Sequence, residues 1–198
     1  MSASSTSPRP QPTVLPFAYP LDDFYAQAGL MLPAIETISG ELVPEPYKTL
    51  LVHADDMTPT LERFHAEPIH LRVLSSQQRD DAYYREVVLV LDPDERPVEF
   101  GAIKINLHLF PPAARQAILG ERRPLGTILH EHAIAHFSRP KAFLKVDSDA
   151  FINSALKLSG KHLLYGRRNA LVDPQQRPLA EIVEILPPVP LPKPSPTS

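Results

Sequence analysis

The chain has 198 residues, of which 43% are hydrophobic and 22% charged, a composition that is ordinary for a globular protein. Its formal net charge of -3 comes without a basic stripe, which argues against nucleic acid as a main partner. It has no cysteine, which excludes disulfides and thiol chemistry, and it has no signal-like or bilayer-length apolar run. These features favour a cytoplasmic protein that is not attached to a membrane.

Prolines gather at the two ends of the chain. Of the 24 prolines, five fall within residues 1–20 and six within 187–198. Proline fixes φ and has no backbone N–H, so these ends predict extended or disordered tails. We therefore expect a Pro-rich tail over 1–20, one domain over 21–187 and a second Pro-rich tail over 188–198.

The domain is expected to begin with short helices. The segment "PLDDFYAQAGLMLP" places Asp22 and Asp23 in a first helical turn, where the helix dipole favours acidic residues. The segment "EPYKTLLVHA" is a second candidate helix. In "DDMTPTLERFHAEP" we expect Thr58 as the N-cap and Pro59 as the first helical residue, with Met57 left in the connector.

Segments rich in β-formers begin at Ile69. The expected strands are "IHLRVLSSQ", "AYYREVVLVLD" and "VEFGAIKINLHL". There follow a helix in "PPAARQAILG", a turn with a short helix or strand in "RPLGTILHEH", separate strands or one bent strand in "HAIAHF" and "AFLKVD", and a helix in "SDAFINSALKLSG" between Ser148 as N-cap and Gly160. "LLYGRRNALVD" and "PLAEIVEILP" form a closing hairpin. Strands joined by short turns predict an α+β fold, with helices on one face of an antiparallel sheet.

The segment "HEHAIAH" raises the question of a metal site. His130, His132 and His136 would share one face of a strand. However, Ala133 stands where the metalloprotease pattern requires a glutamate, and no Asp, Glu or Cys at compact spacing completes a ligand set. We therefore expect a solvated strand face and no metal.

Arg85 interrupts "DDAYYREVVLVLD", a strand expected to be buried on both faces. A guanidinium cannot lose its charge, so burying it without a partner is costly. Its partner is either a protein carboxylate such as Glu184 or the carboxylate of a ligand, which an arginine on a rigid strand binds well.

The closing hairpin carries two acids and two arginines. Side chains alternate along a strand, so Glu181 and Glu184 point to opposite faces, and one of them lies in apolar surroundings. Such surroundings raise a carboxyl pKa and permit general acid–base chemistry, but alternation leaves open which acid this is. Of Arg167 and Arg168, one should face inward, either as a further anion clamp or as the partner of a nearby carboxylate.

Four segments in order resemble the chorismate pyruvate-lyase family over roughly Leu50 to Pro187: "DDMT", "YYREVVLVLD", "RPLGTIL" and the pair "YGRRNALVD"/"RPLAEIVEILP". The resemblance implies a six-stranded antiparallel sheet with helices and flaps covering an internal cavity. It also implies a cofactor-independent carbon–oxygen lyase that converts chorismate to 4-hydroxybenzoate and pyruvate. Such an enzyme would act in aromatic acid biosynthesis, with ubiquinone biosynthesis or another use of the product left open.

The resemblance also implies roles for single residues. Arg85 would bind a substrate carboxylate, while Met57 and Leu125 would contribute backbone N–H groups at the other end of the ligand. Glu184 would mediate proton transfer, with Glu181 as the alternative because the spacing departs by about one residue from the family pattern. The partners would be the substrate and the product alone, with no nucleic acid and no membrane.

Two other functions stay open at this stage. One is a non-catalytic domain of the same fold that binds a small aromatic acid, as in the effector domains of some transcription regulators. The other is a related lyase with a different hydroxybenzoate product. About 50 residues precede the matched region, many of them Pro-rich, which counts against a helix-turn-helix module ahead of it.

Overall fold

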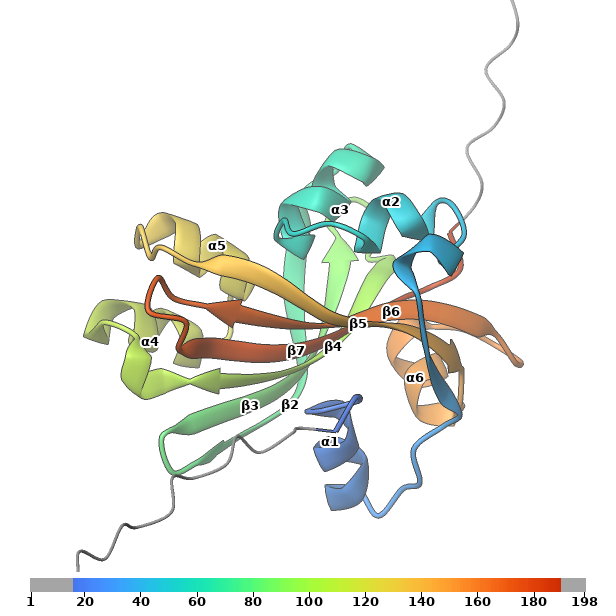
Figure 1. The fold of residues 1–198 in the computed structure, drawn as a ribbon, viewed down its shortest axis with the longest axis horizontal. Coiled ribbons are helices and arrows are strands. Elements are labelled where there is room, and N and C mark those ends of the chain that lie inside the picture. The colour runs from blue at the N-terminus through green and yellow to red at the C-terminus, as the bar shows by residue number, and fades with distance from the viewer. Residues whose placement is uncertain (1–15, 190–198) are drawn as a thin grey trace, which may run out of the picture.

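A computed structural model describes residues 16–189, and a single antiparallel sheet forms its centre (Figure 1). The sheet has seven strands in the order β1-β5-β6-β7-β4-β3-β2. The α+β prediction is therefore confirmed, with seven strands in place of the expected six. The strands are β1 (Ile35–Ile38), β2 (Ile69–Arg79), β3 (Ala82–Leu91), β4 (Pro97–Asn106), β5 (Phe137–Asp147), β6 (Leu163–Val172) and β7 (Pro178–Leu186).

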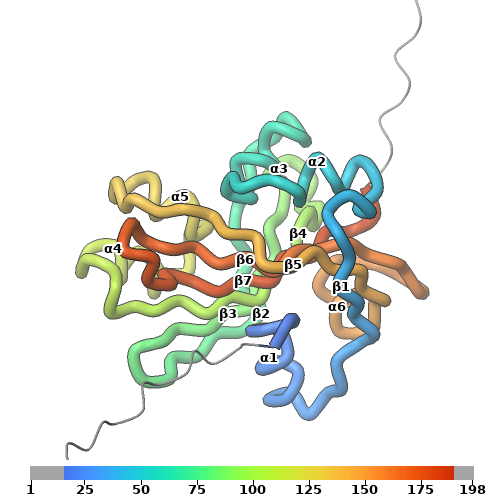
Figure 2. The backbone as a smooth tube through the Cα atoms, in the orientation of Figure 1, coloured from blue at the N-terminus to red at the C-terminus, as the bar shows by residue number. Residues whose placement is uncertain are grey.

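The additional strand is β1, at one edge of the sheet. It pairs antiparallel with the end of β5, with Ile35 opposite Val146 and Ile38 opposite Phe143. It carries the chain from α1 (Leu21–Gln27) past the sheet edge toward α2 (Tyr47–Leu51) (Figure 2). Its four residues are too few to give a clear alternation pattern, and its strand conformation depends on β5 as a partner distant in sequence.

Helices cover both faces of the sheet, so the expectation of helices on one face is wrong. On one face lie α1 and α6 (Ala150–Leu156), and on the other lie α2, α3 (Met57–His65), α4 (Pro112–Leu119) and α5 (Leu125–Glu131). Two short 3-10 helices occupy Gly40–Leu42 and Leu107–Leu109. Helices cover both faces because the central strand β3 is buried on both of them, from Tyr83 to Leu91. A strand that is apolar on both sides needs cover on both sides.

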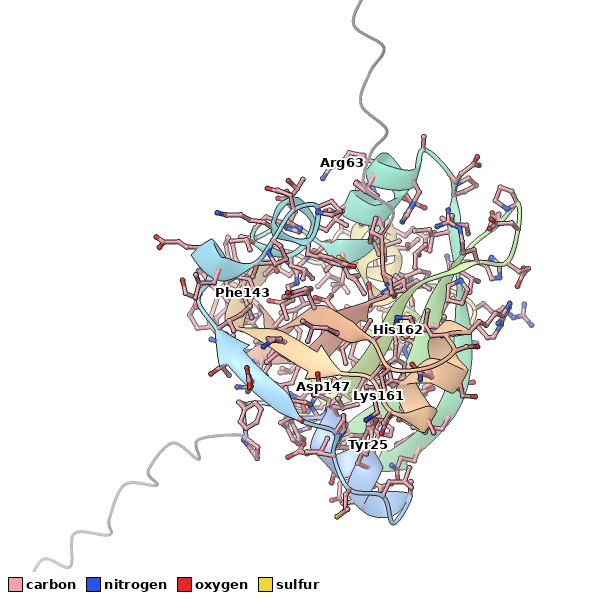
Figure 3. All side chains as sticks on the ribbon, turned by 90° about the vertical axis from the view of Figure 1, so that its right-hand side faces the viewer. Tyr25, Arg63, Phe143, Asp147, Lys161 and His162 are labelled. Atoms are coloured by element: carbon pink, nitrogen blue, oxygen red, sulfur yellow. The ribbon has the colours of Figure 1, made fainter. Side chains whose placement is uncertain are left out.

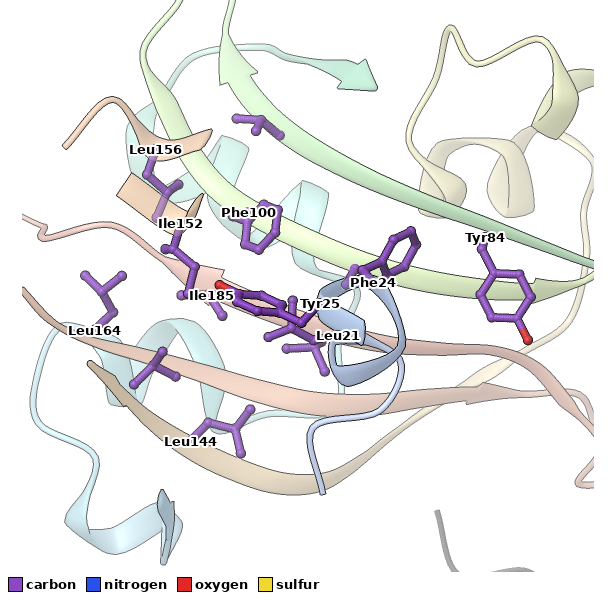
Figure 4. Close-up of a cluster of buried hydrophobic side chains, with 14 of the residues drawn as sticks. Leu21, Phe24, Tyr25, Tyr84, Phe100, Leu144, Ile152, Leu156, Leu164 and Ile185 are labelled. Carbon is purple, nitrogen blue, oxygen red and sulfur yellow. The ribbon is translucent and has the colours of Figure 1, made fainter. Parts of the chain in front are cut away.

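The hydrophobic core accordingly has two layers. On one face, side chains of α1 and α6 pack against even-numbered residues of β3 and β4, such as Val88. Figure 4 shows this cluster, with Phe100 of β4 labelled. On the opposite face one cluster lies under α4 and α5 and another under α2 and α3. Figure 3 shows the two sides, with Tyr25 of α1 and Arg63 of α3 at opposite ends of the view.

Two helices begin elsewhere than expected. Helix α3 begins at Met57 with Asp56 as N-cap, two residues before the expected start. In α6 the N-cap is Asp149, whose side chain accepts the Ile152 N–H, while the Ser148 hydroxyl accepts the N–H of His162 instead. Asp and Ser are similarly good N-caps, so the sequence alone does not separate neighbouring candidates.

The three histidines of "HEHAIAH" do not share a strand face. His130 lies in the last turn of α5, His132 follows that helix, and β5 begins only at Phe137. Of the two alternatives for "HAIAHF" and "AFLKVD", separate strands or one bent strand, the structure has a single strand, β5, with a register shift between Pro140 and Ala142. Within residues 16–189 no three His, Cys, Asp or Glu side chains form a group that could hold a metal ion.

The chain ends fall largely outside the description. Residues 1–15 and 190–198, which make up most of the two expected Pro-rich tails, lie outside the described residues. Between them, no helix is long and apolar enough to cross a membrane. The domain limits of 21 and 187 stay a prediction.

Candidate functional site

The register of the sheet brings polar residues from four strands onto one face. Arg85 pairs with Ile103, and two positions further along the same strands Val87 pairs with Gly101. Gly101 is in turn opposite Glu184 on β7. Because side chains alternate, every second residue from these positions lies on the same face, the one under α2 to α5. The other residues of this face that matter below are Leu89, Glu99, Arg167, Asn169 and Ile182.

A cavity lies between this face and the first turns of α3 and α5. Its volume is about 60 Å³, several times the roughly 10–15 Å³ that one water molecule needs, so it can hold a small molecule. Its walls are mostly apolar. The lining residues are Asp56, Met57, Thr58, Leu71, Arg85, Val87, Leu89, Glu99, Gly101, Ile103, Pro124, Leu125, Gly126, Asn169, Leu171, Ile182 and Glu184.

Arg85 is buried in the wall of this cavity without a partner. Its side chain is 1% exposed, and its Nε and Nη1 have no hydrogen-bond acceptor among residues 16–189. Burial lowers the pKa of its guanidinium, yet the group stays charged at any ordinary pH. Glu184, the protein carboxylate considered from the sequence, is not its partner. The positive charge of Arg85 is therefore turned to the cavity.

Arg167, in contrast, is fully satisfied. It is completely buried and its Nε donates to Glu184 in an ion pair. Its two terminal nitrogens donate to the backbone oxygens of Leu51 at 3.4 Å, of His53 at 3.2 Å and of Asp55 at 3.2 Å. It thus ties the connector between α2 and α3 to β6, which is a structural role.

Glu181 and Arg168 lie on the other face of the sheet. Arg168 Nη2 donates to Glu181 at 3.1 Å, and neither residue lines the cavity. The expected division therefore holds, with Glu184 and Arg167 on the sheet face that carries the cavity and Glu181 and Arg168 on the other face; of these four residues, Glu184 lines the cavity. Of the two acids left open by alternation, Glu184 is the one on the same side as Arg85.

The first turn of α3 is open toward the cavity. The N-cap Asp56 makes no side-chain capping bond, and its carboxylate instead accepts from His136 Nε2 at 2.9 Å. The N–H groups of Met57 and Thr58 belong to the first turn of the helix, where no intrahelical acceptor exists, and Pro59 has no N–H at all. Two backbone donors at a positive helix end are thus left for an acceptor in the cavity.

The first turn of α5 repeats this arrangement. Its N-cap is Pro124, which makes no side-chain capping bond, and it is followed by Leu125 and Gly126. A Cβ on Gly126 would lie 3.7 Å from the side chain of Asp56, so the two helix starts are close neighbours. Met57 and Leu125, singled out from the sequence, are therefore together at one cavity with Arg85.

Glu99 belongs to this site and was missed by the sequence reasoning. It is 4% exposed, and its Oε2 has no hydrogen-bond partner in the described part of the chain. Burial, followed by the negative charge of Glu184, raises the pKa of Glu99 well above its usual range, while Arg167 acts in the opposite direction. A signal existed, because "RPVEFGAI" places an acid inside a buried strand just as "YYREVV" places Arg85.

Comparisons with known proteins support the fold. No protein-family model matches the chain, and no curated protein matches its sequence. The structure is similar to PhnF from Mycobacterium smegmatis, with TM-score 0.50 and 9% identity over 84% of this chain and 92% of that chain. It is also similar to the PhnF effector domain, with TM-score 0.50 and 11% identity over 66% and 87%. A GntR-family transcriptional regulator from Bacillus cereus gives TM-score 0.45 and 9% identity over 66% and 99%.

These neighbours correct the functional expectations. They share the chorismate lyase-like fold, so the expected fold class is confirmed. The identification as a chorismate pyruvate-lyase, the lyase activity and the place in aromatic acid or ubiquinone biosynthesis are wrong, because the structures similar at TM-score 0.50 are PhnF and its effector domain. The segments that carried the resemblance follow the fold, and one fold can serve different functions.

The expectation of no nucleic-acid partner is wrong for the same reason. It depended on net charge and on the 50 or so residues before the matched region. Net charge reports on the surface of this domain alone, and a regulator can contact DNA through another part of the protein. A structure similar at TM-score 0.50 is described as an effector domain.

We expect the two buried arginines to respond oppositely to removal. Arg85→Met should raise the free energy of unfolding of the ligand-free protein by roughly 1–3 kcal/mol, because it removes a buried charge without a partner. Arg167→Met should lower it by about 3–5 kcal/mol, because it leaves Glu184 buried and unpaired. Urea denaturation followed by circular dichroism measures both, and a destabilised Arg85→Met would contradict the description of Arg85.

The His136–Asp56 contact should make stability depend on pH. The hydrogen bond that His136 donates to the Asp56 carboxylate raises the pKa of His136 above its ordinary 6.5, against the effect of burial. Its contribution, roughly 1 kcal/mol, is therefore complete below the unfolded-state pKa and is lost as pH rises through the folded-state pKa. His136→Gln should be destabilised relative to wild type at about pH 5.5 and much less at about pH 9.

The control for this measurement is His162→Gln. His162 Nε2 contacts only the backbone oxygen of Ser159, on an exposed part of the chain far from α3 in sequence. Thermal unfolding across the pH range should show the pH-dependent difference for His136→Gln alone. Equal curves for the two variants would show that the contact with Asp56 contributes nothing.

Proposed function

We propose that this domain binds a small organic anion and acts as a non-catalytic, regulatory ligand-binding domain. The observation that carries the proposal is Arg85, a buried guanidinium at a cavity wall with no acceptor among the described residues. A buried charge without a counter-charge is expensive, and a carboxylate or another planar anion bound in the cavity would offset that cost.

The charges around the cavity favour one negative group on the ligand. Glu184 is neutralised by Arg167, and Asp56 is paired with His136. Glu99 tends to the neutral form because its pKa is raised well above the usual range. Among the described cavity-lining residues Arg85 is then the charge without an ion pair; Glu121, whose charge acts on it, does not line the cavity and accepts from the Tyr83 hydroxyl. A monoanion restores neutrality, whereas a dianion would leave an excess negative charge in apolar surroundings.

The helix ends add donors that are suited to the same group. The free N–H groups at the starts of α3 and α5 belong to residues that line the cavity, and helix N-termini attract anions. The rest of the wall is apolar and suits a hydrocarbon body. The preferred ligand is accordingly a carboxylate, or a similar anion, on a compact apolar framework.

A regulatory role is supported by the position of these donors. A ligand held by Arg85 on β3 and by the first turns of α3 and α5 would connect three separate elements of the fold. Its binding would favour one arrangement of both helices over the sheet, which is how occupancy of a site becomes a conformational signal. The fold is shared with effector domains of regulators. We propose that the signal serves transcriptional control, with DNA as a partner of the whole protein in the cytoplasm.

Binding is tested with benzoate and other monocarboxylates, together with inorganic phosphate, by isothermal titration calorimetry on the 198-residue chain. We expect at least one of these anions to bind and Arg85→Met to weaken it by about ten- to hundredfold, as for the loss of a charge-assisted hydrogen bond. Arg168→Met, on the opposite sheet face, is the matched control and should bind as wild type does.

The non-catalytic part of the proposal is tested on the same samples. After long incubation the bound anion should be recovered unchanged by chromatography. Conversion of the ligand to a product would contradict the proposed role, and so would equal affinity in Arg85→Met and wild type.

A further inference from the structure

Glu99 and Arg85 lie at different places along the cavity. Glu99 pairs with Leu89, and Leu89 stands four residues from Arg85 on the same face of β3. With about 3.4 Å of rise per residue, the two positions are separated by roughly 13 Å along the strands. Both residues line the cavity. A ligand whose anionic group is near Arg85 would therefore present its other end toward Glu99.

One carboxyl oxygen of Glu99, the buried Oε2, has no hydrogen-bond partner in the described part of the chain. The charged groups that bear on it are Glu184 on β7 and Arg167 on β6, and Arg167 already forms an ion pair with Glu184. One arginine neutralises one carboxylate, so the second carboxyl in this group is favoured in its neutral form. A neutral carboxyl has an O–H donor, and burial without an acceptor is costly for that donor.

We infer that Glu99 determines ligand specificity, its carboxyl donating a hydrogen bond to an uncharged oxygen at the end of the ligand remote from Arg85. The inference rests on the proposed function and specifies its ligand class. The ligand is a two-ended molecule with an anionic group at one end and a carbonyl, ether or hydroxyl oxygen at the other. A second carboxylate in that place would add negative charge beside Glu184.

Gly101 makes room for this arrangement. It stands two positions after Glu99 on the same face and opposite Glu184. A Cβ at Gly101 would lie 3.2 Å from Glu99 Oε1 and 3.1 Å from Val87 Cγ2. The atom of Glu99 that it would meet is the end of a flexible side chain, so Gly101→Ala should displace the carboxyl while the fold persists.

Two probe ligands test the inference, benzoate and 4-acetylbenzoate, which differ by one uncharged carbonyl-bearing group. For the full-length wild-type chain at about pH 6 we expect calorimetry to show 4-acetylbenzoate binding about tenfold more tightly, as for one buried hydrogen bond. Glu99→Gln keeps a neutral donor and should keep this preference. Glu99→Leu and Gly101→Ala should lose it and still bind benzoate.

The matched control is Glu86→Gln. Glu86 is also buried on β3, but it faces the other side of the sheet, where it accepts from Ser75. Its replacement should leave the affinities for both probes and their ratio unchanged. If Glu86→Gln changed the ratio of the two affinities, the preference for 4-acetylbenzoate would depend on the stability of β3 and not on a contact with Glu99.

The protonation of Glu99 gives a second readout that needs no ligand. Difference carbon-13 NMR spectra between wild type and Glu99→Gln should show the Glu99 carboxyl titrating well above the usual glutamate range. The preference for 4-acetylbenzoate should fall as pH rises through that titration in wild type and stay constant in Glu99→Gln. A Glu99 that is already ionised at about pH 6 would overturn the inference.

The outcomes separate the two proposals. If benzoate binds through Arg85 but 4-acetylbenzoate has no advantage in wild type, the role of Glu99 is refuted and the anion site stands. If neither probe nor any monocarboxylate or phosphate binds, the proposed function fails and the role of Glu99 fails with it. If the preference exists and survives in Glu99→Leu, another residue supplies the donor and the inference is overturned.

Discussion

The burial of two arginine charges on one face of a sheet is the constraint on which the rest of this structure depends. Arg167 and Arg85 are both almost inaccessible to water. Arg167 has a carboxylate and three backbone oxygens as acceptors, whereas Arg85 has none for Nε and Nη1 among the described residues. The first arginine therefore holds the protein together, and the second stores an unfavourable interaction that a ligand can relieve.

The elements around Arg85 are arranged so that this interaction is not relieved by the protein itself. Glu184, on the same face, is already bound to Arg167, and Asp56 is bound to His136. Glu121, whose charge acts on Arg85, accepts a hydrogen bond from the Tyr83 hydroxyl. The starts of α3 and α5 present backbone N–H groups, which are donors and cannot neutralise a guanidinium. The carboxylates of Glu184 and Asp56 are thus occupied by other partners and do not compete with an anion for Arg85.

Much of this could be predicted from the sequence, and what escaped has physical causes. The strand content, the burial of Arg85 and the opposite directions of Glu181 and Glu184 follow from local periodicity alone. Strand β1 and the second helical layer depend on partners distant in sequence, which periodicity does not report. The role of Arg167 was left open because an inward arginine is the same in sequence whether it meets a carboxylate or a ligand. The family resemblance predicted the fold correctly and the activity incorrectly, since one fold can serve different functions.

The proposal of binding in place of catalysis is supported by how the two cavity acids are held. Glu184 is fixed by an arginine that also anchors three backbone carbonyls, so moving a proton through it would disturb the connector between α2 and α3. Among the described residues Glu99 forms no such ion pair, and burial favours its neutral form. A neutral carboxyl can donate a hydrogen bond. Recognition then requires no proton transfer. On the proposed function, the ligand would supply the negative counter-charge that Arg85 lacks, and the resulting gain in stability would couple occupancy of the cavity to the positions of α3 and α5.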